Sequence, residues 1–262
     1  MHLRMLIGTL AGFASVGFVA WRVHDMHHRI ICNIGIVADP SASHPGGCSS
    51  LQGIAEEILG GHPMPAGSWL AVLAIGEEST SNEPRLLARY PIPVNRRIME
   101  GPTTSLKRKQ QILDDLKLRC GELHPTMVSP IFQGVSQGLA ELRGLGCAND
   151  SDCKLWVDSD LEENTVSTIK TVLEHPDSKR LGLPTRLENE GIHVAFCGLA
   201  VTAGRIIGPS GREVRKARPR DPSHDDNLRR TWAALFTKPE LVTFDPYCPG
   251  PRPSGETGSP KY

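Results

Sequence analysis

The sequence has no net charge, and this balance excludes one class of long-range interaction. Its 29 basic and 29 acidic residues cancel over 262 positions. A chain with balanced charge creates no overall field that attracts nucleic acid or an anionic membrane surface. We therefore expect no nucleic-acid partner, and any charged contact would depend on a local patch.

Several sequence motifs that mark common active sites are also missing. No two of the 7 cysteines have the Cys-x-x-Cys spacing of zinc and redox centres. There is no Walker-type glycine loop, and no Gly-x-Gly-x-x-Gly pattern follows the first apolar run. These absences argue against a structural zinc site, a P-loop nucleotide site and a Rossmann-type dinucleotide site.

The N-terminus contains a long uncharged stretch from Met5 to Trp21. A helix of this length spans ~26 Å, slightly less than the ~30 Å hydrocarbon core of a bilayer. We interpret residues 5–21 as a single-pass membrane anchor within an N-terminal segment, 1–28. A cleaved secretion signal and a buried helix are the alternatives. Arg4 and Arg22 flank the stretch, so charge does not decide which side of the membrane the rest occupies.

After this segment, apolar runs alternate with helical patterns up to about residue 245. We expect strands at 29–38, 68–76, 86–95, 153–160, 191–201 and 241–244, and helices at 48–59, 105–120, 129–144, 163–175 and 226–237. This alternation predicts an α/β domain over 29–245, with a doubly wound, mostly parallel sheet flanked by helices. Residues 202–226 form a long basic connection that does not belong to this alternation of strands and helices. Residues 246–262 have the composition of a disordered tail.

Polar side chains gather where two of the predicted strands end. Asp39, Ser41 and Ser43 follow the first strand, whereas Asp158 and Asp160 end the fourth. In open α/β sheets, ligands bind beyond the carboxyl ends of strands where the strand order reverses. If these two strands are neighbours there, their side chains share one crevice, and hard oxygen ligands of this kind suit Mg²⁺, Mn²⁺ or Ca²⁺.

A third segment belongs to the same predicted crevice. Ser129 precedes Pro130 and the apolar stripe of the 129–144 helix, so we expect it to be the helix N-cap. Two assignments stay open. Thr126 is an alternative to Ser129 as the ligand from this segment, and Asp158 is an alternative to Asp160 as the ligand that follows the fourth strand.

Together the three segments resemble the metal-ion-dependent adhesion site of von Willebrand factor A domains. They are "DPSAS" after the first strand, "SPIFQGVSQGL" opening a helix and "LWVDSDLEEN" ending a strand. Their order and approximate spacing match the family over residues 29–245. In this sequence Ser129 takes the place of a family Thr, while Ser159 and Leu161 replace the Thr and Gly of the family's Thr-Asp-Gly segment.

The resemblance implies a function. The metal would be Mg²⁺, or Mn²⁺ or Ca²⁺, and its ligands, direct or through water, would be Asp39, Ser41, Ser43, Ser129 and Asp160. A Glu or Asp from a partner protein would fill one open coordination position. The chain would then be a membrane-tethered protein-interaction module and not an enzyme.

Two other functions compete with this interpretation. Asp158 and Asp160 form an Asp-x-Asp pair that suits Mg²⁺-dependent phosphoryl or glycosyl transfer. Alternatively, the domain is a scaffold without metal, in which Asp and Ser side chains bond to backbone amides of a turn.

The cysteines and tryptophans give further structural expectations. Cys147 and Cys153 flank a short loop and would close a disulfide outside the cytoplasm. Cys197 lies in an apolar run and is expected to be a small core residue. Trp69 and Trp156 also lie in apolar runs, and we expect both in the core.

Overall fold

The structure is a computed structural model, and it describes the parts of the chain that form the sheet and most of its helices. The described residues are 33–39, 47–60, 67–75, 84–92, 102–123, 129–147, 152–162, 166, 169, 186–198, 206–207, 213–215, 222–245 and 248. The anchor expected at residues 5–21 lies outside them. Within the described residues, no helix has the length and apolar character needed to cross a membrane.

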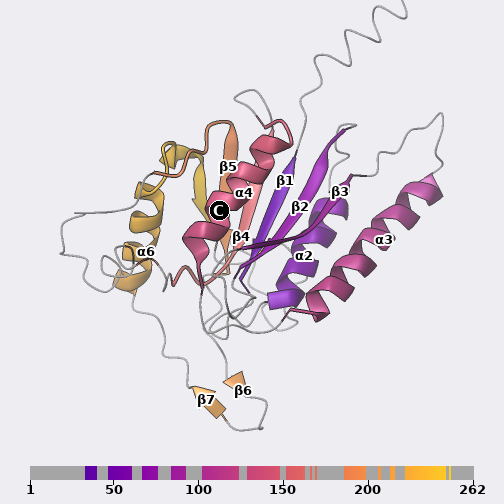
Figure 1. Ribbon diagram of the computed structural model, residues 1–262. Helices are drawn as coiled ribbons and strands as arrows, with labels where there is room; N and C mark the ends of the chain where they lie inside the picture. Colours follow the sequence, from indigo (N-terminus) through magenta and orange to yellow (C-terminus); the bar gives the residue numbers. More distant parts are fainter. Residues whose placement is uncertain are drawn as a thin grey trace, which may run out of the picture. The chain divides into compact units, whose positions relative to one another are not determined.

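Six strands form the central sheet (Figure 1). In chain order they are β1 (Ile34–Ala38), β2 (Trp69–Ala74), β3 (Arg85–Pro91), β4 (Cys153–Asp158), β5 (Ile192–Cys197) and β8 (Val242–Phe244). Their spatial order is β3-β2-β1-β4-β5-β8, and every neighbouring pair is parallel except β2 with β3. The predicted doubly wound α/β class is therefore confirmed, with the strand order reversing between β1 and β4.

The strands form where the apolar runs predict them. All five residues of β1 are buried, as expected for a central strand covered on both faces. Strand β3 instead alternates between exposed and more buried positions and ends at Pro91. Because proline cannot donate to a ladder, β3 suits the edge of the sheet that it occupies.

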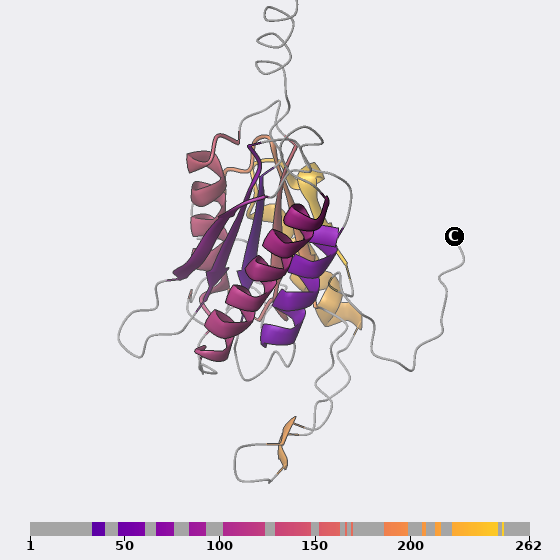
Figure 2. The ribbon, with the colours of Figure 1, turned by 90° about the vertical axis from the view of Figure 1, so that its right-hand side faces the viewer.

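Helices cover both faces of the sheet (Figure 2). On one face lie α2 (Gly47–Gly60) and α3 (Pro102–Gly121), and on the other α4 (Ile131–Gly144) and α6 (Pro222–Ala234). Two buried clusters fill the layers. Val135, Leu139 and Trp232 belong to the α4–α6 cluster, whereas Leu51 and Leu116 belong to the α2–α3 cluster.

The remaining described elements are small. β6 (Ile206–Ile207) and β7 (Glu213–Arg215) form a separate antiparallel ribbon within the connection expected to lie outside the sheet. The 3-10 turn η1 (Pro239–Leu241) precedes β8. The helix expected at 163–175 lies almost entirely outside the described residues, of which only the buried, helical Ile169 and the partly buried Val166 fall in that range.

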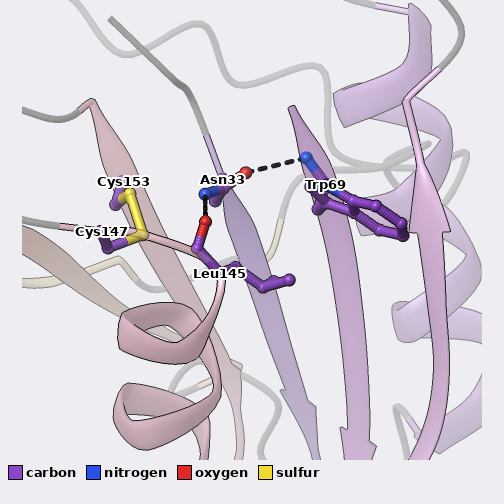
Figure 3. Close-up of a disulfide and its surroundings, with 5 residues drawn as sticks. All are labelled: Asn33, Trp69, Leu145, Cys147 and Cys153. Atoms are coloured by element: carbon purple, nitrogen blue, oxygen red, sulfur yellow. Dashed lines mark hydrogen bonds between the residues drawn. A yellow bond between two sulfur atoms is a disulfide. The ribbon is translucent and has the colours of Figure 1, made fainter. Parts of the chain in front are cut away.

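The predicted Cys147–Cys153 disulfide is present and lies near the amino end of β1 (Figure 3). Beside it, the buried Asn33 side chain donates to the Leu145 carbonyl at 2.9 Å and accepts from the Trp69 backbone N–H at 2.9 Å. These contacts join the start of β1 to the end of α4 and to β2. They fix the end of the sheet at which β1 and β4 begin, opposite to the strand ends that form the candidate site.

Cys197 is buried in the core, as expected. It is not a free thiol there, because it forms a disulfide with Cys248, whose position lies beyond the domain boundary expected at residue 245. The expectation that Trp69 and Trp156 lie in the core is wrong, because both are only partly buried. The Lys154 ammonium lies 3.8 Å from the centroid of the Trp156 ring, a cation–π contact.

Candidate metal centre

The carboxyl ends of β1 and β4 lie side by side, which is the condition that the sequence analysis set for a shared crevice. Ala38 is in register with Asp158, and the Asp39 N–H donates to the Asp158 carbonyl at 3.0 Å. Because the chain leaves both strands at this point, Asp39 and Ser159 begin two adjacent loops. The strand order reverses between these strands, so the loops lie where open α/β sheets bind ligands.

The Asp39 carboxylate is the centre of the site. It is fully buried, and the Ser159 hydroxyl donates to its Oδ2 at 2.9 Å. The Ser129 hydroxyl, from the segment before α4, approaches its Oδ1 at 3.4 Å. A hydroxyl that donates its hydrogen to a carboxylate keeps its lone pairs for another partner, so these contacts are compatible with a cation held by the same oxygens.

The turn after β4 is fixed by its own side chains. The Leu161 N–H donates to Ser159 Oγ at 3.1 Å, and the Glu162 N–H donates to Asp160 Oδ1 at 3.1 Å. Asp160 is almost fully buried. The turn therefore holds the Ser159 hydroxyl against Asp39, and the next residue is the buried Asp160.

Leu161 has a left-handed backbone conformation, with φ of 64°. This conformation costs an ordinary L-residue about 1 to 2 kcal/mol relative to the right-handed region, whereas glycine adopts it freely. The resemblance to the adhesion site places a glycine at this position. The backbone geometry thus agrees with the alignment of Leu161, and its buried side chain contributes packing that a glycine lacks.

Helix α6 contacts the same turn in two places. The Trp232 indole N–H donates to the Leu161 carbonyl at 3.0 Å within the buried core. At the rim, His224 Nε2 lies 2.9 Å from Glu162 Oε1. No local sequence pattern could have identified these residues, because Trp232 is 71 positions from its partner.

The expectation that Ser129 is the N-cap of its helix is wrong. Helix α4 begins at Ile131, with Pro130 at the N-cap and no side-chain hydrogen bond to the cap. The Ser129 hydroxyl is directed at Asp39 instead. A tertiary contact thus replaces the local one that the sequence favours.

Part of the predicted ligand set lies outside the described residues. Ser41, Ser43 and the competing Thr126 are not described. The structure brings Asp39, Ser129 and the turn containing Asp160 together, and their roles as metal ligands stay a prediction.

Asp158, the alternative to Asp160 in the sequence analysis, has a different environment. It is fully buried, in register with Cys197, and its Oδ1 lies 3.1 Å from Cys248 Sγ. Its carboxylate and the two sulfur atoms form a compact cluster. Since metal ligation requires thiolates and these sulfurs share a disulfide, the cluster is not a metal site as it stands.

One sequence pattern is excluded as an active site by its place in the fold. Residues Gly134 to Gly138 match the Gly-x-Ser-x-Gly pattern of hydrolase nucleophiles. That pattern functions at a sharp turn between a strand and a helix. Here it lies inside α4, and Ser136 faces solvent.

The fold and the site define a doubly wound α/β domain with a polar, oxygen-rich site at its switch point. No family model matches the sequence, and no curated protein matches it.

Solved structures do match the chain. It is similar to proximal thread matrix protein 1 from the mussel byssus, with 13% identity, 83% of this chain and 44% of that chain covered, and a TM-score of 0.40. It is similar to the manganese-loaded TRAP protein of Plasmodium vivax, with 12% identity and a TM-score of 0.38, and the match covers 73% of this chain and 65% of that chain. The chain spans less than two thirds of each of these two.

A third match is the vWF domain of the type V pili tip protein Mfa5 from Porphyromonas gingivalis. The identity is 11%, the match covers 82% of this chain and 89% of that chain, and the TM-score is 0.36. Structures to which this chain is similar thus include a domain of the family named from the three sequence segments.

Proposed function

We propose that this chain is a divalent-metal-dependent protein-interaction module. A cation at the Asp39 site would bind a Glu or Asp side chain of a partner protein. One observation carries the proposal: a buried carboxylate at the switch point receives hydroxyl groups from two other chain segments, through Ser129 and Ser159. Membrane attachment through residues 5–21 stays a prediction.

The described residues at the site suit a hard cation. Asp39, Ser129 and Asp160 offer carboxylate and hydroxyl oxygens, which Mg²⁺, Mn²⁺ and Ca²⁺ prefer. Ser41 and Ser43 would complete the set. When bound, the cation would supply a positive charge that attracts a partner's carboxylate, while the protein holds the oxygens in place.

The enzyme alternative receives no support from the geometry around the Asp-x-Asp pair. Asp158 lies against the Cys197–Cys248 disulfide, whereas Asp160 accepts from the Glu162 backbone within its own turn. Paired carboxylates in metal-dependent transfer enzymes act on one shared ion. Their different partners here favour Asp160, together with Asp39, as the metal-binding acid.

Calorimetric titration of Mn²⁺ into the full-length chain tests the proposal. We expect Asp39→Ala to abolish binding at the site and Ser129→Ala to weaken it by about tenfold, because the first removes a charge and the second one neutral oxygen. Asp114→Ala, at an exposed acid on α3, is the matched control and should bind like wild type. Circular dichroism confirms that each variant is folded.

Two results would contradict the proposal. One is a wild-type chain that binds neither Mn²⁺ nor Mg²⁺ at millimolar concentration. The other is an Asp39→Ala variant that binds the ion as tightly as wild type.

A further inference from the structure

We propose that Trp232 is a positioning residue for the metal centre. Its indole N–H holds the Leu161 carbonyl, and this bond keeps the turn after β4, which contains Asp160, in the conformation that presents the Ser159 hydroxyl to Asp39. The inference rests on the proposed function, since it assigns a role within the same site.

The first step is the conformation of Leu161. A leucine with φ of 64° occupies a region that only glycine enters without cost, so other contacts must hold it there. Its N–H donates to Ser159 Oγ and its carbonyl accepts from Trp232. Both backbone polar groups of the strained residue are therefore hydrogen-bonded, one on each side of the turn.

The second step is the rigidity of the donor. Trp232 is fully buried, and its ring lies 5.4 Å from that of Phe196, which stacks on Phe244 at 5.3 Å. A side chain packed in this way cannot change rotamer without disturbing its neighbours. The direction of the indole N–H is thus set by the core and not by the turn.

The third step is the connection from this bond to the site. Trp232 binds Leu161, Leu161 binds the Ser159 hydroxyl, and that hydroxyl donates to Asp39 Oδ2. The three hydrogen bonds form an uninterrupted path from α6 to the end of β1. Loss of the first bond leaves a buried carbonyl without that donor and allows the turn to relax away from Asp39.

Trp232→Phe tests the role, because phenylalanine keeps an aromatic ring but has no donor. Phe236→Leu is the matched control, since Phe236 is also buried and packs on Phe196 at 6.0 Å. We expect Trp232→Phe to weaken Mn²⁺ binding by about fivefold to tenfold, the loss expected for one buried hydrogen bond. Phe236→Leu should change the affinity by less than about twofold.

A metal-free measurement separates this inference from the proposed function. In hydrogen exchange without added metal, Trp232→Phe should speed exchange of the Leu161 and Glu162 amides more than Phe236→Leu does. If the wild-type chain binds no Mn²⁺, the proposed function fails, and the exchange result alone decides whether Trp232 positions the turn.

Rescue by glycine provides the most specific test. In the Leu161→Gly background the left-handed conformation needs no support, so adding Trp232→Phe should change Mn²⁺ affinity and local exchange by less than about twofold. Near-UV circular dichroism confirms that the four proteins of this cycle are folded. Equal effects of Trp232→Phe and Phe236→Leu, or an unchanged effect of Trp232→Phe in the Leu161→Gly background, would overturn the inference.

Discussion

Asp39 shows how single side chains make the candidate site possible. Burial of a carboxylate is costly unless hydrogen bonds or an opposite charge compensate for the lost water. The hydroxyls of Ser129 and Ser159 supply part of this compensation. A cation bound at the proposed site would place an opposite charge beside this buried carboxylate.

The residue scale is also where prediction from sequence succeeds and fails most clearly. The motif spacing placed Asp39, Ser129 and the turn containing Asp160 in one region, and the structure brings Ser129 and Ser159 of that turn to Asp39. The motif spacing missed the N-cap position of α4 and the bond from Trp232, because tertiary contacts between distant segments determine both. Short local patterns carry no information about such contacts.

Glycines in α4 provide a test of packing at this scale. A Cβ at Gly134 would lie 2.2 Å from Ile75 Cγ2 and 3.1 Å from Val37 Cγ1. Gly134→Ala should therefore destabilise the domain by about 1 to 3 kcal/mol, the usual cost of overpacking a core. Gly144→Ala, where nothing lies within 4 Å, is the control and should be neutral or slightly stabilising. Urea unfolding measures both, and equal stability of the two variants would contradict the close packing of α4 on β1 and β2.

At the scale of elements, a polar cluster attaches α3 to the edge strand β3. The Tyr90 hydroxyl donates to Asp115 Oδ2 at 2.6 Å, and Arg119 Nε donates to the same oxygen at 2.8 Å. Arg119 also donates to the Leu87 carbonyl at 3.0 Å. The Tyr90 hydrogen bond, followed by that of Arg119, lowers the pKa of Asp115, while burial and the Asp115 bond raise the pKa of Tyr90.

These shifts predict how the attachment depends on pH. The Asp115 contribution is complete above the ordinary pKa of 3.8 and is lost as pH falls through its lowered pKa. The Tyr90 contribution is complete below the ordinary pKa of 10.0 and is lost as pH rises through its raised pKa. Tyr90→Phe should therefore reduce stability by about 1 kcal/mol at neutral pH, with a smaller difference from wild type once the pH falls below the lowered pKa of Asp115. Urea unfolding at neutral pH and in acid measures this, and a difference that persists unchanged in acid would show that the Tyr90 hydroxyl does not act through the ionised Asp115 carboxylate.

Secondary structure was largely predictable because the apolar runs determine where most strands form. The continuous apolar run before Asp39 became β1, and the proline-containing run after Pro84 became the edge strand β3. The Cys197–Cys248 disulfide was not predictable by the same logic. Cys197 has the surroundings of a core residue, and its partner lies 51 positions away in a segment whose composition suggests disorder.

The described part of the molecule combines a polar site at the carboxyl ends of β1 and β4 with covalent links. Cys147–Cys153 closes a loop near the amino ends of these strands, and Cys197–Cys248 joins the end of β5 to a later segment. Cys120 is also disulfide-bonded. Disulfides in this number are typical of proteins in oxidising compartments. Variants of the domain for binding studies should therefore keep Cys248 and be purified without reductant.

The location of a bound ion is the most direct test of the central claim, that Asp39, Ser129 and Asp160 build one cation site. The measurement is anomalous diffraction from crystals of the protein soaked with Mn²⁺. We predict a peak at the carboxyl ends of β1 and β4, about 2.0 to 2.6 Å from at least one oxygen of these residues, with water-bridged contacts to the others. Well-ordered crystals in which this edge of the sheet is resolved and Mn²⁺ binds only elsewhere, or not at all, would contradict the account.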